Sequence, residues 1–183
     1  MSVDVSSPVL HEPAVFVEAD RAVYGRVSQF LYQQSEFLDN RDWESWAGLF
    51  DPEEGFYWIP AHPDDDSPVG RPCICFEDRH LMRTRIKRLQ NPKAWSQLPP
   101  HRTSHVVSNV TILELAGDPA APESVLVQSR FHMVELRWDK QRYFAGRYRH
   151  HLVSHGDGFQ IKLQRTDLLN YDAPLDYVLQ SWV

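Results

Sequence analysis

Four long segments in the second half of the chain constrain the fold most, because each is rich in the β-branched and aromatic residues that favour strands. They are separated by turn-forming residues and span Arg102–Leu115, Ser124–Trp138, Arg142–Ser154 and Phe159–Leu169. A straight strand of about 14 residues would run roughly 45 Å. A domain of this size cannot use that length as a flat sheet, so we expect a mainly antiparallel sheet with strong twist and β-bulges.

The first half of the chain has helical periodicity instead. Apolar residues recur at helical spacing from Glu18 to about Leu38, and Asn40 and Asp42 can cap a second, short helix. A third helix is predicted at Glu77–Leu89. Helices followed by consecutive long strands indicate an α+β fold. We expect about three N-terminal helices packed on a strongly curved sheet, which together form a cone with an open end.

A dense aromatic stretch, Phe37–Pro60, lies between the helices. Trp43 and Trp46 fall on one face of the short helix, which Pro52 ends, and Phe56–Ile59 then suits a strand. Large aromatic side chains therefore converge from a helix and a strand. Two interpretations stay open at this point, a hydrophobic core and an aromatic-lined ligand pocket.

Composition excludes several classes of protein. With 42% hydrophobic residues and a formal net charge of -6, the chain is predicted to be globular and to have no nucleic-acid partner. No signal peptide is evident, and no stretch approaches the roughly 20 apolar residues that span a membrane. Cys73 and Cys75 suggest neither a disulfide nor a metal site, which favours the cytoplasm. We expect an N-terminal arm at residues 1–17 and a single domain at residues 18–183.

Candidate catalytic residues are few. His101 and His105 would suit a metal site on a helix, but on the predicted strand they lie about 13 Å apart. The sequence contains no GxSxG, GxGxxG, P-loop or HExxH motif. One hypothesis is a stand-alone isomerase or dehydratase that uses His105 and Asp78 as acid and base inside the cone. The other expectation is that the chain has no catalytic, cofactor-binding or metal-binding residues of its own.

Other features point to contacts with partners. Trp95 lies in a loop with prolines and Trp182 lies in the apolar end segment, so both are predicted, together with Arg102, at a subunit interface. The acidic loop at residues 61–72 is interpreted either as a solvated connection or as a cation or partner contact.

Several motifs carry a resemblance to a known family. They are FLDNRDWESWAGLFDPEEGFYWIPA, EDRHLMRTRIKRL, RTSHVVSNVTI, the segment from Phe144 to Val153 and LQRTDLLNYDAPL. In this order and spacing the chain resembles the small (β) subunit of bacterial aromatic-ring-hydroxylating dioxygenases, most of all the branch that acts on benzoate and anthranilate. The resemblance implies the cystatin-like α+β cone that is shared with nuclear transport factor 2 (NTF2), in agreement with the cone expected above.

The resemblance also implies a function and partners. Such β subunits are structural and form a hexamer of three large (α) and three small subunits, so contacts with other β subunits are expected too. The large subunit carries a Rieske [2Fe-2S] cluster and a mononuclear Fe(II), and NAD(P)H supplies electrons through a reductase. The implied reaction adds O2 to an aromatic ring.

Overall fold

The described part of the chain begins with two helices, as predicted. The computed structural model describes residues 19–95, 98–174 and 179–183, and the predicted arm at residues 1–17 lies outside them. Helix α1 spans Arg21–Asp39, and the side chain of Asp20 caps it. Helix α2 spans Trp43–Gly48 and begins at Asp42, whose carboxylate accepts a hydrogen bond from the Ser45 N–H. The capping role predicted for Asp42 is therefore confirmed.

The next segment contains the strand predicted at Phe56–Ile59 and a second strand, at Cys73–Asp78, that the sequence pattern did not predict. Strand β1 spans Phe56–Pro60, and strand β2 spans Cys73–Asp78 and pairs with it in antiparallel register. Helix α3 spans Arg79–Gln90. The predicted helix at Glu77–Leu89 therefore starts two residues late, because the backbone of Glu77 pairs with Tyr57 in the sheet.

Four long strands complete the sheet: β3 at Arg102–Asp118, β4 at Ala121–Arg137, β5 at Lys140–His155 and β6 at Gly158–Leu168. The six strands follow the order β2-β1-β6-β5-β4-β3, and β1 runs parallel to β6 while every other neighbouring pair is antiparallel. The register shifts at several points, among them Ser108/Thr111 and His151/Leu152. The predicted bulges in long antiparallel strands are confirmed.

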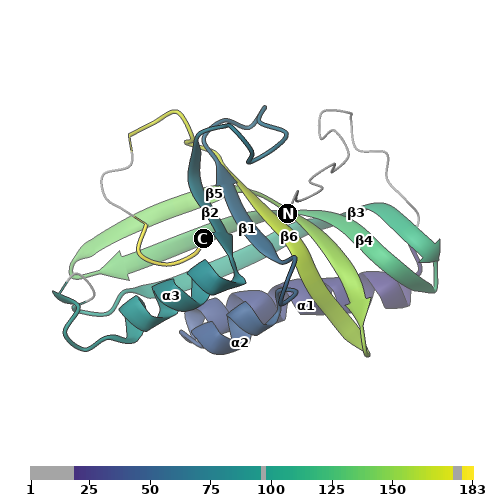
Figure 1. Cartoon of the computed structure of the whole chain (residues 1–183), viewed down its shortest axis with the longest axis horizontal. Coiled ribbons are helices and arrows are strands. Elements are labelled where there is room, and N and C mark those ends of the chain that lie inside the picture. The colour runs from purple at the N-terminus through teal and green to yellow at the C-terminus, as the bar shows by residue number, and fades with distance from the viewer. Residues whose placement is uncertain (1–18, 96–97, 175–178) are drawn as a thin grey trace.

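The three helices lie along one face of the curved sheet, and the loop at residues 61–72 projects beyond its other face (Figure 1). The core fills the space between helices and sheet, with Val27 and Leu31 from α1, Ile86 from α3 and Val127 from β4 almost fully buried. This arrangement is the predicted α+β cone. Within the described part of the chain, none of the helices has the length and apolar character that a membrane span needs.

Candidate functional site

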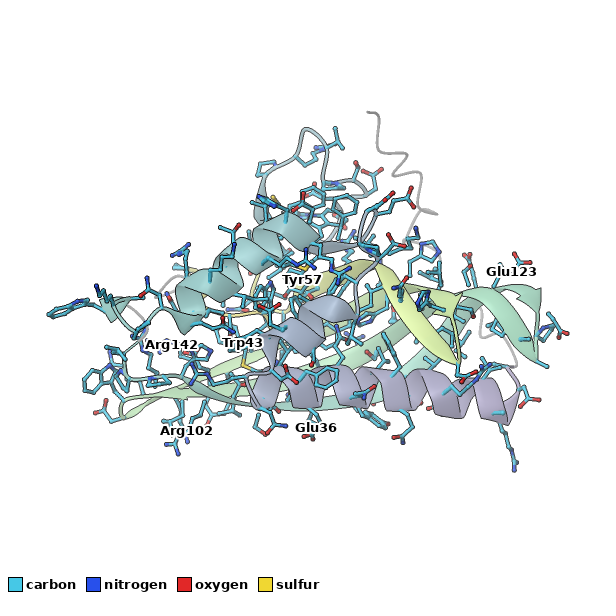
Figure 2. All side chains as sticks on the ribbon, turned by 60° about the horizontal axis from the view of Figure 1, so that its bottom comes forward. Glu36, Trp43, Tyr57, Arg102, Glu123 and Arg142 are labelled. Atoms are coloured by element: carbon cyan, nitrogen blue, oxygen red, sulfur yellow. The ribbon has the colours of Figure 1, made fainter. Side chains whose placement is uncertain are left out.

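Aromatic side chains pack in the interior of the cone, where the site of a cone-shaped enzyme would be expected. Trp46 from α2 lies 4.3 Å from Trp182 between ring centroids, and Trp43 lies 5.8 Å from the same ring. Trp46 also contacts Phe50 and Tyr57 edge to face. Figure 2 shows Trp43 and Tyr57 in this region, between α2, α3 and the sheet. The aromatic stretch is therefore core, and the first of its two interpretations is confirmed.

The end segment of the chain completes this packing. Trp182 and Val183 are 1% and 0% exposed, so both are enclosed by the cone. The hydroxyl of Tyr57 donates to the Val183 carbonyl at 2.9 Å, and the indole N–H of Trp182 donates to Glu77 at 2.9 Å. Glu77 is in turn paired with Arg85 of α3 at 2.5 Å. A substrate in this part of the cone would have to displace two fully buried residues and their hydrogen bonds.

The predicted acid–base pair of His105 and Asp78 does not form. Asp78 is the N-cap of α3, and its carboxylate accepts a hydrogen bond from the Leu81 N–H at 2.8 Å. His105 instead contacts Asp39, at the end of α1, with 2.6 Å between Nδ1 and Oδ1. The pairing hypothesis is therefore wrong, because capping a helix and facing the cone interior require different orientations of Asp78.

The His105–Asp39 pair is well held. The Asp39 carboxylate also accepts hydrogen bonds from the backbone N–H of His105 and from the Thr103 hydroxyl, each at 2.8 Å. Burial opposes ionisation of Asp39, but the hydrogen bonds and charge of His105 outweigh it and lower the pKa of this carboxyl. The His105 side chain is fully buried, and its Nε2 has no hydrogen-bond partner among the described residues. This geometry suits a buried pair that links α1 to β3.

Two other histidines are buried as neutral groups. Burial lowers the pKa of His150 to about 3, and its Nε2 lies 3.1 Å from the side-chain oxygen of Gln34. The Gln34 amide donates to Gln164 at 2.5 Å, so α1, β5 and β6 are joined by one polar chain. Burial, followed by the positive charges of Arg41 and Arg137, lowers the pKa of His101 to about 4. Neither imidazole carries a charge at neutral pH.

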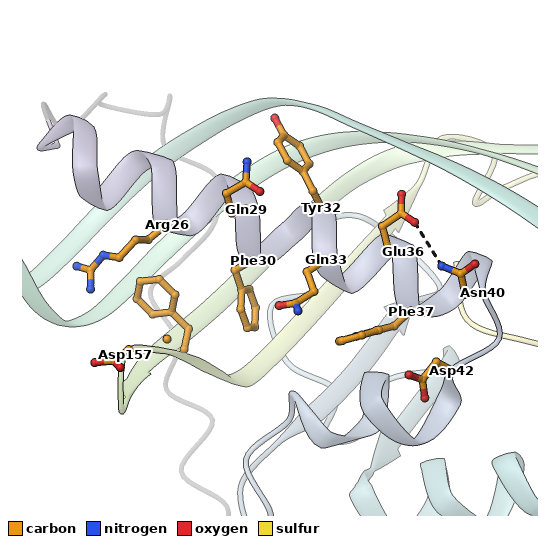
Figure 3. A pocket seen from close by; sticks show the side chains of 12 residues that line it. Arg26, Gln29, Phe30, Tyr32, Gln33, Glu36, Phe37, Asn40, Asp42 and Asp157 are labelled. Atoms are coloured by element: carbon orange, nitrogen blue, oxygen red, sulfur yellow. Dashed lines mark hydrogen bonds between the residues drawn. The ribbon is translucent and has the colours of Figure 1, made fainter.

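A groove of about 730 Å³ lies outside the cone, along α1 and the turn between β5 and β6. Figure 3 shows Phe30 and Phe37 beside polar side chains such as Gln33, and the Glu36 carboxylate accepts a hydrogen bond from Asn40 at 3.3 Å. The groove is open, and no pair of its acidic side chains is held together as a catalytic pair would be. Among the residues that the structure describes, no three His, Cys, Asp or Glu side chains gather as a metal site.

The predicted interface residues separate into two groups. Trp95 is 87% exposed, and Arg102 is exposed too. Figure 2 shows Arg102 and Arg142 at one end of the sheet and Glu123 at the other end. Trp182 is enclosed by its own chain, so its prediction as an interface residue is wrong. Within the described part of the end segment, Trp182 and Val183 are buried, and Trp182 is held by intrachain contacts with Trp46 and Glu77.

Comparison with known proteins decides the family. The model of a family described as "Ring hydroxylating beta subunit" matches residues 33–172, which is most of the chain. The chain belongs to the ring-hydroxylating β-subunit family. The match starts inside α1 and ends beyond β6, so it includes the buried aromatic residues of α2 and β1 as well as all six strands.

Individual relatives agree with this membership. The small subunit of anthranilate 1,2-dioxygenase from Acinetobacter baylyi is 34% identical over 82% of this chain and 93% of its own length. The β subunit of toluate 1,2-dioxygenase from Pseudomonas putida is 33% identical over 67% of this chain and 75% of its own. The resemblance inferred from the sequence motifs is thereby confirmed.

The fold is shared with solved β subunits. The β subunit of benzoate 1,2-dioxygenase from Burkholderia mallei superimposes with a TM-score of 0.68 over 89% of this chain and 99% of that one, at 21% identity. The predicted NTF2-like cone is confirmed. Membership of the ring-hydroxylating β-subunit family favours a subunit of a multicomponent dioxygenase over a stand-alone isomerase or dehydratase.

Proposed function

We propose that this β subunit is the structural component of a dioxygenase that adds O2 to the ring of an aromatic acid, and that it works in the cytoplasm. The relatives named for anthranilate and toluate support the substrate class, because both are aromatic carboxylates. The single observation that carries the structural role is the packing beside α2, where the buried Trp182 and Val183 occupy part of the cone interior. The role is then to hold a partner in place.

The proposed partner is the large (α) subunit, in a hexamer of three large and three small subunits that also brings β subunits together. The Rieske [2Fe-2S] cluster and the mononuclear Fe(II) are assigned to the large subunit, and NAD(P)H to a separate reductase. This assignment rests on the family resemblance. The described residues of the β subunit do not fit either iron centre, because no group of three possible ligands gathers among them.

An interface is proposed at the end of the sheet where β4 meets β5. Trp95, Leu98 and Trp138 are 87%, 51% and 72% exposed there, and the Arg137 guanidinium joins the loop to β4 through the Leu98 carbonyl at 3.3 Å. Exposed tryptophans with neighbouring arginines have the composition of an interface core. Trp95 and Arg102 therefore stay proposed contact residues.

Co-expression with the proposed large subunit tests the proposed role. The expected result is a stable complex of the two chains that contains iron and hydroxylates an aromatic acid when its reductase is present. The isolated β subunit should show no turnover and no stoichiometric iron. Mass photometry gives the stoichiometry and elemental analysis gives the iron. Turnover of an aromatic acid by the β subunit alone would contradict the proposal.

His105→Asn separates a structural histidine from a catalytic one. The asparagine amide can stand where Nδ1 stands and keep the hydrogen bond to Asp39, so we expect a cost of only about 1–2 kcal/mol in the free energy of unfolding. Turnover per assembled complex should change by less than about tenfold. Loss of a catalytic acid or base should instead cost on the order of a hundredfold or more.

Iron content and the fraction of assembled complex are measured beside the rate of His105→Asn. Fewer complexes with an unchanged rate per iron would support the structural role, because weaker packing lowers the amount of enzyme and not the rate of each site. A hundredfold slower rate with iron and assembly intact would assign chemistry to this chain.

A further inference from the structure

Among the residues that the structure describes, the face of the sheet that points away from the helices is covered on one half only. Over β1 and β6 the loop at residues 61–72 covers it, because the Arg165 guanidinium lies 4.6 Å above the Trp58 ring and donates to the Pro63 carbonyl at 2.7 Å. Over β3, β4 and β5 the described part of the chain leaves the face open, with Val106 59% exposed and Tyr143 70% exposed. We call this second half the open face.

A row of arginines borders the open face. Arg130 of β4 is directly opposite Arg147 of β5, and Arg149 of β5 is directly opposite Arg165 of β6. Asp167, which lies opposite Arg147, has a carboxylate among these arginines. It accepts a hydrogen bond from the Arg165 Nε at 2.6 Å. Arg130 and Arg147 therefore face each other, while the carboxylate opposite Arg147 is paired with Arg165. Like charges placed directly opposite each other in a sheet are destabilising.

The Arg147 guanidinium is partly buried beside other positive charges of this row. Burial lowers the pKa of Arg147, and the charge of Arg130 adds to that effect. Burial likewise lowers the pKa of Arg149 to about 10, while Asp167 opposes the shift. Guanidinium groups nevertheless stay protonated near neutral pH. The buried Nε of Arg147 has no hydrogen-bond partner in the part of the chain that the structure describes.

We propose that the open face is a docking surface for an acidic segment of the large subunit, with a carboxylate of that partner seated against Arg130 and Arg147. This inference rests on the proposed function, which supplies the partner. Charge complementarity supports it, because a carboxylate accepts bidentate hydrogen bonds from a guanidinium and would offset the repulsion between Arg130 and Arg147. The exposed Val106 and Tyr143 on the same face are typical of a surface that binds a protein partner. The formal net charge of -6 disfavours a nucleic acid.

Arg130→Glu is the sharpest variant, because its effects on folding and on docking have opposite signs. Arg130 is exposed, and a glutamate there would face Arg147 and relieve the repulsion in the isolated chain. The midpoint of urea unfolding of the β subunit should therefore stay the same or rise. The same glutamate would repel an incoming carboxylate, so the affinity for the co-expressed large subunit should fall by at least about tenfold. Added NaCl should weaken assembly of the wild type more than that of the variant.

Arg83→Glu is the matched control, since Arg83 is exposed on α3, in the helical layer, and its replacement changes the net charge equally. A second variant, Arg147→Gln, removes one charge of the row without adding a negative one. Equal assembly of Arg130→Glu, Arg147→Gln and Arg83→Glu with the large subunit would overturn the docking surface and leave the proposed function standing. If the wild-type chain itself fails to bind the large subunit, the proposed function fails and the docking surface with it.

Discussion

Trp182→Ala should lower the free energy of unfolding of the β subunit by about 3–5 kcal/mol, the usual cost of removing a fully buried large aromatic side chain. The indole is 1% exposed and packs against the Trp46 ring with 4.3 Å between the ring centroids, so an alanine would leave a cavity that α2 cannot readily fill. The substitution also removes the N–H that donates to the buried Glu77. Urea unfolding of the isolated subunit measures the loss. A change below about 1 kcal/mol would show that the end segment does not complete the core.

Trp95→Ala is the matched control for this experiment. It removes the same side chain from a site that is 87% exposed, so the free energy of unfolding should change by no more than about 0.5 kcal/mol. Its effect should be seen in assembly with the large subunit, where an exposed tryptophan is a strong candidate for a contact. Trp182→Phe is a useful third variant, because it keeps a ring in the core and removes only the hydrogen bond to Glu77.

Both tryptophans carry the same signal in the sequence, an aromatic residue outside any periodic element, yet they lie in opposite environments. Local signals predicted the local structure well. Asp42 was identified as a cap, and the long β-branched segments were identified as strands, because caps and strand propensity depend on neighbours in the chain. The burial of Trp182 depends on Trp46 and Glu77, which lie more than a hundred residues away in the sequence.

The candidate site shows the same limit. His105 was singled out correctly as a histidine on a strand, but its partner is Asp39 and not Asp78. Asp39 is the last residue of α1, and Asp78 comes directly before α3. Only the packing of α1 across β3 decides which of the two aspartates contacts the imidazole. Strand β2 was missed for a related reason. Its pairing with β1 crosses the loop at residues 61–72, and its last residues also read as the first turn of a helix.

Stability of the β subunit should fall steeply as the pH drops below about 6.5, the ordinary pKa of an exposed imidazole. Burial lowers the pKa of His150 to about 3 and that of His101 to about 4. Well above pH 6.5 these imidazoles are neutral in the folded and the unfolded chain, so they do not make the free energy of unfolding depend on pH. As the pH falls from about 6.5 to about 4, the unfolded chain binds two protons that the folded chain does not bind, which favours unfolding. Each histidine then contributes a loss of about 1.4 kcal/mol per pH unit.

His150→Gln isolates one of these two contributions, because glutamine does not titrate and can still bond to Gln34. The variant can be less stable overall, so the quantity to compare is the slope of the free energy of unfolding against pH, from urea unfolding between pH 6 and pH 4.5. That slope should be smaller than in the wild type by about 1.4 kcal/mol per pH unit. Equal slopes in the wild type and His150→Gln would mean that His150 is protonated in the folded subunit. The polar chain through Gln34 and Gln164 would then have to hold a buried positive charge, which without a carboxylate beside it would be costly.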